Sequence, residues 1–114
     1  MIQLKFENLM TEVLEGVSGT EVVVSHCVFP PNFTLPKHWH PGEEFVYVVE
    51  GALTLWLEGK DAVTISAGEV IKVPYKVVHT ASTGDDAVTL IAFRVHEEGQ
   101  PERVLVEDAT AEAA

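Results

Sequence analysis

The chain has 114 residues and carries 7 lysines and arginines against 18 aspartates and glutamates, a formal net charge of −11. This length allows one compact domain and excludes two independent ones, and a hydrophobic content of 46% excludes a disordered or collagen-like chain. The acidic charge repels phosphate backbones and anionic lipid, so nucleic acid and membrane surfaces are not expected as partners. We expect one globular domain over residues 1–114, whose core needs no disulfide or metal to hold it together.

Cys27 is the single cysteine of the chain, so no intrachain disulfide can form. The N-terminus lacks a basic start followed by an apolar stretch, and no uncharged run approaches the roughly 20 apolar residues of a membrane span. These features predict a cytoplasmic protein without a signal peptide or membrane anchor.

Short runs of β-branched and aromatic residues, bounded by Gly, Pro, Asn and Asp, dominate the sequence, and helical periodicity is nearly absent. The short links between these runs carry the residues of tight turns. Many short strands with short links predict an all-β fold, either a closed barrel or two packed sheets. In chain order, the expected strands are residues 21–29, 33–40, 45–50, 52–58, 62–65, 70–73, 77–81 and 87–95.

The two ends of the chain are less regular. Residues 8–15 fit either a strand or one face of a helix, and we favour the strand because a glycine-containing break, residues 16–19, precedes the next strand as in a hairpin. Residues 97–114 contain six acidic residues against Arg103 alone, which is typical of a solvated, solubilising end.

The residue pattern that indicates chemistry begins at His38 and His40, which lie two apart in an expected strand. Both imidazoles then project from the same face of that strand. Pro41 and Gly42 are expected to make a turn, and Glu44 opens the next strand, so its carboxylate can return to the same place. These three side chains predict a site that residues 38–44 build largely by themselves.

His79 lies at the end of a later strand and could complete the set from across a barrel. Three imidazole nitrogens and one carboxylate oxygen suit iron, manganese, nickel, cobalt, zinc or copper as divalent ions, and the ligand set does not choose among them. A six-coordinate ion would keep two open positions for substrate or dioxygen.

Alternation from Glu44 sends Val46 and Val48 towards the same cavity, and Phe45, Tyr47 and Val49 away from it. The wall near the predicted metal is therefore apolar, which suits a hydrophobic or aromatic substrate.

Two motifs resemble those of the small single-domain cupins, and of the quercetin dioxygenase-like cupins in particular. The first cupin motif, G-x5-H-x-H-x3/4-E-x6-G, fits residues 32–51, with His38, His40 and Glu44 in register. The second motif, G-x5-P-x-G-x2-H-x3-N, fits residues 68–83, with His79 in register. All four ligand positions are intact, and both motifs occur in order with the correct spacing.

Three motif positions differ from the family pattern. Asn32 stands in place of a glycine, but asparagine tolerates the positive φ that such a turn requires. Lys76 replaces a second glycine, and Thr83 replaces the final asparagine. We expect these departures to affect the local loops and not the ligands.

The resemblance implies a double-stranded β-helix, with two antiparallel sheets curled into a barrel that holds a metal near one mouth. It also implies that the metal ligands are His38, His40, Glu44 and His79, and that the protein is a homodimer. Cupins include dioxygenases, isomerases, decarboxylases, lyases and non-catalytic binding proteins, so the fold alone does not give the reaction.

The remaining chemically active or aromatic side chains have simpler interpretations. Glu43 is an alternative ligand only if the strand phase shifts at the turn. The aromatic residues expected on an outer sheet face, in packing or a dimer interface rather than a substrate platform, are Trp39, Phe45, Tyr47 and Trp56. His26 and His96 are expected to be surface or hydrogen-bonded residues, with a role in the pocket as the alternative. Tyr75 and Lys76 are expected in a plain turn, with a place at the mouth of the site as the alternative, and Cys27 is expected to be a small buried residue.

These observations support a metal-dependent oxidoreductase, similar to dioxygenase-like cupins, that acts on a small enolisable or aromatic molecule. Glu44 is the candidate catalytic residue, because it can take a proton from a substrate hydroxyl whose pKa falls on coordination. The alternatives are a non-catalytic, metal-dependent binding or sensing module, and an isomerase, lyase or decarboxylase.

Overall fold

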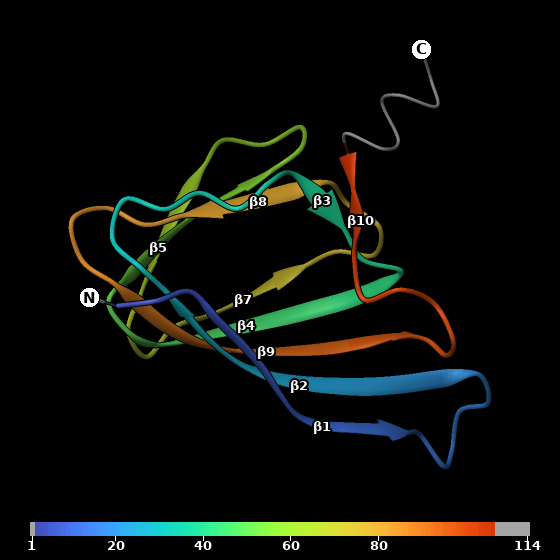
Figure 1. The fold of residues 1–114 in the computed structure, drawn as a ribbon. Helices are drawn as coiled ribbons and strands as arrows, with labels where there is room; N and C mark the ends of the chain where they lie inside the picture. The colour runs from blue at the N-terminus through green and yellow to red at the C-terminus, as the bar shows by residue number, and fades with distance from the viewer. Residues whose placement is uncertain (1, 107–114) are drawn as a thin grey trace.

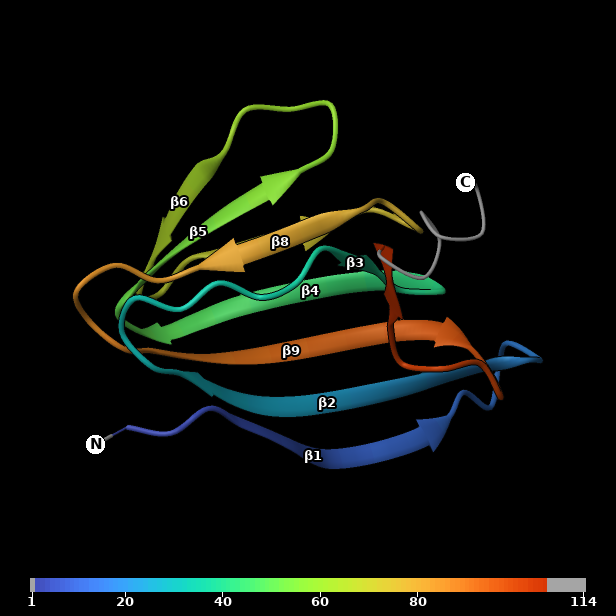
Figure 2. The same cartoon turned by 45° about the horizontal axis from the view of Figure 1, so that its top comes forward.

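The computed structural model describes residues 2–106, which form two five-stranded antiparallel sheets facing each other across a common core (Figures 1 and 2). The first sheet has the order β1-β2-β9-β4-β7 and the second has the order β10-β3-β8-β5-β6. The strands are β1 (Lys5–Val13), β2 (Thr20–Phe29), β3 (His38–Trp39), β4 (Gly42–Glu50), β5 (Ala52–Leu57), β6 (Val63–Ser66), β7 (Val70–Val73), β8 (His79–Ser82), β9 (Val88–Glu97) and β10 (Val104–Leu105).

From β2 onward the chain passes repeatedly from one sheet to the other, so residues far apart in sequence meet inside the barrel. β4 lies between β9 and β7 in the first sheet, while β3 pairs with β8 in the second. The elements that carry the two cupin-like motifs therefore face the same interior. Within residues 2–106, no helix is long and apolar enough to cross a membrane.

The predicted strands are confirmed with one large change. Residues 33–40 were expected to be extended throughout, but only His38–Trp39 forms a strand, preceded by an isolated bridge between Thr34 and Ser82. Pro36 interrupts the segment, and a proline has no N–H to donate to a neighbouring strand. At the N-terminus, the strand interpretation is confirmed, because β1 pairs with β2 along its length.

The segment after β9 corrects the expectation of a wholly solvated acidic end. Val104 and Leu105 form β10, which pairs with Trp39 and His38 of β3. A two-residue strand among acidic residues carries too short an apolar pattern to be recognised in the sequence. Residues 107–114, the remainder of the expected solvated end, lie outside the described residues.

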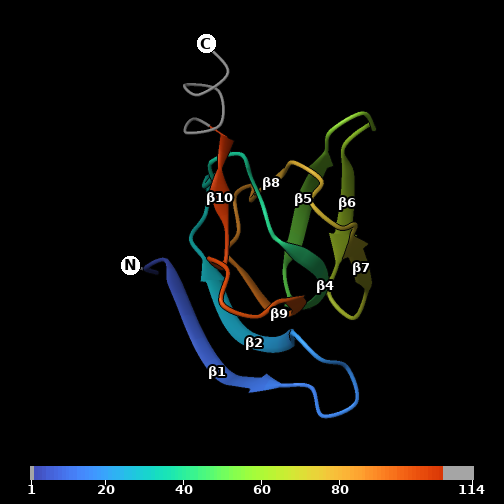
Figure 3. The same cartoon turned by 90° about the vertical axis from the view of Figure 1, so that its right-hand side faces the viewer.

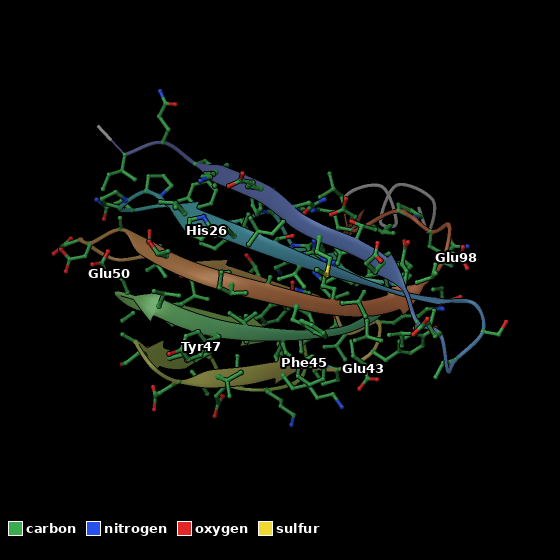
Figure 4. All side chains as sticks on the ribbon, turned by 90° about the horizontal axis from the view of Figure 1, so that it is seen from below. His26, Glu43, Phe45, Tyr47, Glu50 and Glu98 are labelled. Atoms are coloured by element: carbon green, nitrogen blue, oxygen red, sulfur yellow. The ribbon has the colours of Figure 1, made fainter. Side chains whose placement is uncertain are left out.

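The core follows strand alternation, and β4 shows this most clearly. Val46 and Val48 are 5% and 0% exposed, whereas Tyr47 and Val49 are 46% and 47% exposed. Figure 4 shows Phe45 and Tyr47 on the outer face of the first sheet, as predicted. The core residues come from both sheets and include Leu53 and Leu55 of β5, Ala81 of β8 and Leu90 of β9.

β1 forms the outer edge of the first sheet, beyond β2, and all nine of its residues are exposed (Figure 3). It bulges between Asn8 and Met10, which changes the face on which its later side chains lie. Before the bulge, Phe6 and Asn8 pair with Cys27 and Ser25, two buried residues of β2. The side chains of Phe6 and Asn8 therefore lie beside the interior of the barrel.

Candidate metal centre

His38 and His79 are direct partners in the pairing of β3 with β8. Residues directly opposite each other in a sheet present their side chains on the same face, and both imidazoles are buried, at 4% and 2% exposed. His40 follows β3 on the way into β4 and is 3% exposed. The second sheet and its connection to the first thus supply three buried imidazoles to one place.

The three imidazoles lie close enough together to hold one ion. One nitrogen from each of His38, His40 and His79 lies within 4.8 Å of the other two. The ring centroids are 4.3 Å apart for His38 and His79, 4.9 Å for His38 and His40, and 5.0 Å for His40 and His79.

The hydrogen bonds of the three rings fix which nitrogen is available. Each Nδ1 lies against a backbone carbonyl: His38 at 2.7 Å from Pro36, His40 at 2.6 Å from Glu102 and His79 at 2.9 Å from Val77. A carbonyl can only accept, so Nδ1–H donates and the Nε2 lone pair is left free. The Nε2 atoms of His40 and His79 are buried and have no hydrogen-bond partner within residues 2–106. Such unpaired acceptors, held by carbonyl bonds on the other nitrogen, fit metal ligation.

Burial lowers the pKa of His38 from 6.5 to about 4, and the neighbouring His79 contributes to the same shift. At neutral pH His38 is therefore an uncharged imidazole, which is the form that binds a metal.

Glu44 reaches the cluster from the other sheet. It lies in the middle of three strands, opposite Val73 of β7 and Arg94 of β9, and is 7% exposed. Its Oε1 is 3.5 Å from Nε2 of both His40 and His79. Burial alone would raise the pKa of Glu44, but the adjacent imidazoles of His40 and His79 outweigh this effect and hold the pKa well below the usual value.

A buried arginine beside Glu44 was not predicted from the sequence. Arg94 is 4% exposed, and its guanidinium donates to Glu44 at 3.4 Å, to Ser25 at 3.0 Å and to Glu102 at 2.9 Å. Asn8 closes this network, because its side chain accepts from Ser25 and donates to Glu102. Strand alternation could have predicted the burial of Arg94. It follows the apolar residues at positions 88, 90 and 92 of β9 at the same two-residue spacing, so its side chain faces inward with theirs.

Glu102 connects the segment before β10 to the site in two ways. Its carbonyl accepts from Nδ1 of His40, and its carboxylate pairs with Arg94. The part of the chain expected to be a solvated end therefore orients one predicted ligand and partly neutralises the buried arginine.

The pocket that contains these groups is mainly apolar. Its empty space is about 440 Å³, including the part open to solvent. Around the polar groups, its wall is formed by Phe6, Cys27, Phe29, Leu35, Val46, Leu53, Leu55, Ala81, Leu90 and Ala92, with Arg103 also in contact. Val46 lines the pocket as predicted, whereas Val48 belongs to the core behind it.

Several other candidates lie away from the pocket. Glu43 is on the outer face, where its carboxylate contacts Lys72, and His26 is on the outer face of β2 (Figure 4). Tyr75 lies in a turn after β7, where it is 51% exposed and donates a hydrogen bond to Glu97.

His96 and Cys27 are both buried. His96 was expected to be a surface or hydrogen-bonded residue, but it is 3% exposed. Its Nε2 lies 3.5 Å from the carboxylate of Glu21, and neither ring nitrogen has a hydrogen-bond partner in the described structure. His96 lies two residues after Arg94 on β9, so strand alternation turns both side chains inward. Burial raises the pKa of the Cys27 thiol to about 11, so it is a neutral part of the pocket wall.

The three departures from the family motifs are accommodated in the loops. Asn32 and Lys76 adopt φ values of 54° and 59°, in the left-handed region that favours glycine. The Thr83 hydroxyl donates to the Pro30 carbonyl at 2.6 Å and accepts from the Phe33 amide at 2.9 Å. Thr83 thereby holds the turn that leads towards His38.

Comparison with known families gives a match over more than half of the chain. Residues 25–94 match the family described as "Cupin domain". This segment includes the three histidines of the cluster, Glu44 and Arg94.

Two curated proteins are similar in sequence. An uncharacterized protein of Methanocaldococcus jannaschii is 31% identical over 68 residues, which are 59% of this chain and 59% of that protein. The polyketide synthase CurC of Streptomyces cyaneus is 31% identical over 85 residues, which are 73% of this chain and 53% of that protein. The chain thus spans between half and three fifths of the length of these relatives.

Solved structures share the fold. The DMSP lyase DddQ from Ruegeria pomeroyi has a TM-score of 0.74 at 20% identity, covering 90% of this chain and 51% of that one. A cupin-like protein from Thermotoga maritima has a TM-score of 0.71 at 25% identity, covering 90% of this chain and 74% of that one.

Proposed function

This chain belongs to the cupin family, and we propose that His38, His40, His79 and Glu44 hold one divalent transition metal ion per chain. The observation that carries this proposal is the arrangement of the imidazoles. Their Nδ1 atoms are bonded to carbonyls, while the Nε2 atoms of His40 and His79 are buried without a partner in the described part of the chain. Glu44 adds an ionised carboxylate on the side of the first sheet. Iron, manganese, nickel, cobalt, zinc and copper all accept such a ligand set.

We further propose an oxidoreductase of the dioxygenase-like cupin type, acting on a small enolisable or aromatic molecule. A bound ion of this kind would supply a Lewis acid with open coordination positions. The apolar wall from both sheets would hold the body of the substrate and exclude water.

Glu44 would act as the proton acceptor in this reaction. Its carboxylate is ionised and lies inside the pocket, as a base for a substrate hydroxyl must. Arg94, 3.4 Å from Glu44, orients the carboxylate and stabilises its negative charge.

Oxygen consumption tests the proposed reaction. Protein loaded separately with iron, manganese, nickel or copper is assayed against flavonols, diketones and catechols. We expect oxygen uptake with at least one combination, and loss of that uptake in Glu44→Gln and His40→Ala. Absence of uptake throughout, or full uptake in Glu44→Gln, would contradict the assignment, and saturable binding without turnover would favour a binding module instead.

We also propose that the chain forms a homodimer through the outer face of the first sheet. That face exposes Tyr47, Val49 and Phe93 at 46%, 47% and 39%, and Phe45 packs beside Phe93 with ring centroids 6.4 Å apart. An apolar sheet face can be covered by the same face of a second copy around a two-fold axis.

Light scattering coupled to gel filtration tests this interface. Tyr47→Lys is expected to shift the mass from dimer to monomer. Val63→Lys is the matched control, because Val63 is similarly exposed, at 44%, but lies in β6 of the other sheet. A monomeric wild-type protein would contradict the proposal.

A further inference from the structure

Both arginines of the chain line the same pocket. The sequence contains only Arg94 and Arg103, and each contacts the pocket that holds the histidine cluster. In a chain with a net charge of −11, this placement concentrates positive charge where it is otherwise scarce. Arginine is suited to bind a carboxylate, because its guanidinium offers several N–H donors in a planar fork.

Arg94 has unused donor capacity inside the pocket. Its two terminal nitrogens bond Glu44, Ser25 and Glu102, but its buried Nε has no hydrogen-bond partner among the described residues. Leaving such a donor unpaired in the interior is costly, and an anionic acceptor would satisfy it.

Arg103 forms part of the pocket wall together with an aromatic ring. Its guanidinium carbon lies 4.6 Å from the ring centre of Phe6. Phe6 is 40% exposed and also lines the pocket. This contact fixes a partly buried cation beside a surface that can cover an apolar ligand.

The fixed charges favour an anionic ligand over a neutral one. Arg94 and Arg103 are offset by the carboxylates of Glu44 and Glu102, both of which contact Arg94. If the histidines hold a divalent cation, as proposed above, the pocket keeps the positive charge of that ion. The mainly apolar wall disfavours an inorganic anion such as phosphate, because it leaves the remaining oxygens of that anion without hydrogen-bond partners.

We propose that Arg94 and Arg103 make this pocket selective for a small organic monocarboxylate with an apolar body. The carboxylate is recognised by the arginines and the apolar body by the wall formed from both sheets. This inference deepens the proposed function, since it names the substrate class of the same site.

Calorimetric titration of the zinc-loaded protein tests the inference without an activity assay. The probes are hexanoate and benzoate, each compared with its neutral amide of nearly the same shape, and inorganic phosphate. We expect both carboxylates to bind at least about tenfold more tightly than their amides, as charge-assisted hydrogen bonds predict.

Arg103→Gln isolates the arginine contribution, because Arg103 is half-buried and its replacement leaves the core intact. We expect carboxylate affinity to fall about five- to tenfold while zinc affinity and amide binding stay unchanged. The control is Lys60→Gln, which removes the same charge from an exposed turn between β5 and β6 and should not change any of these values.

Equal binding of acids and amides, preference for phosphate, or equal losses in Arg103→Gln and Lys60→Gln would overturn the inference. Zinc binding by itself then still supports the metal site. Conversely, carboxylate binding that depends on Arg103 in a protein unable to bind zinc would support the arginine assignment while contradicting the proposed metal function.

Discussion

Replacing Gly42 by alanine should damage both the fold and the metal centre. Gly42 opens β4 opposite His96 of β9, and a Cβ at this position would lie 2.2 Å from the Cβ of His96 and 2.3 Å from the carbonyl oxygen of Val95. An ordinary contact needs at least 3.4 Å. Gly42 is therefore required for close approach of two strands, whereas the sequence suggested only a turn.

These short distances determine how much stability Gly42→Ala should lose. Because the obstructing atoms include backbone, the two strands must separate by about 1 Å, and overpacking of this kind costs at least about 1–3 kcal/mol. For a domain of 114 residues, 1 kcal/mol lowers the melting temperature by about 4 °C. His40 and Glu44 flank Gly42 in sequence, so zinc affinity should also fall by about tenfold.

Calorimetric melting of the metal-free protein and zinc titration measure the two effects. Gly84→Ala is the control, because a Cβ there meets no atom of residues 2–106 within 4 Å and Gly84 is not at positive φ. That variant should melt within about 2 °C of the wild type. Equal melting temperatures for Gly42→Ala and Gly84→Ala would refute the close approach of β4 and β9 at the metal centre.

Three further substitutions or reactions test the surroundings of the site. Lys76→Gly should stabilise the protein by roughly 1 kcal/mol in urea unfolding, because it removes the strain of a lysine in the left-handed conformation. A loss of stability would contradict this. Asn32→Gly should change the stability less, since asparagine tolerates that conformation better. Glu102→Ala should cost about 1–2 kcal/mol in the same assay, since it removes a 2.9 Å ion pair from buried Arg94 but its own side chain is 45% exposed; unchanged stability would show that the pair contributes nothing. At pH 8, Cys27 should react with a disulfide reagent only after unfolding, because its pKa is raised to about 11, and reaction of the native thiol at the rate of a free peptide would contradict the burial.

Much of the fold follows from local sequence features. Alternation counted from Glu44 correctly assigned Val46 and Val48 to the interior and Tyr47 and Val49 to the outside. Turn residues separated the strands, and the two-residue spacing of His38 and His40 placed their imidazoles together.

The missed features depend on contacts between distant segments. The Arg94 network joins residues from β1, β2, β4, β9 and the segment before β10, and no local pattern announces such a meeting. β10 depends on pairing with β3 rather than on its own composition. The carbonyl of Glu102 that orients His40 is a backbone group, which residue identity does not reveal.

The most direct test of the central claim is elemental analysis of untagged protein, purified without chelators or metal columns. The proposed site predicts about one equivalent of a divalent transition metal per chain, with most of it lost in His40→Ala and His79→Ala while circular dichroism shows that both variants remain folded. A wild-type protein that contains no metal and binds none on titration, or variants that keep full occupancy, would contradict the assignment of these histidines as ligands.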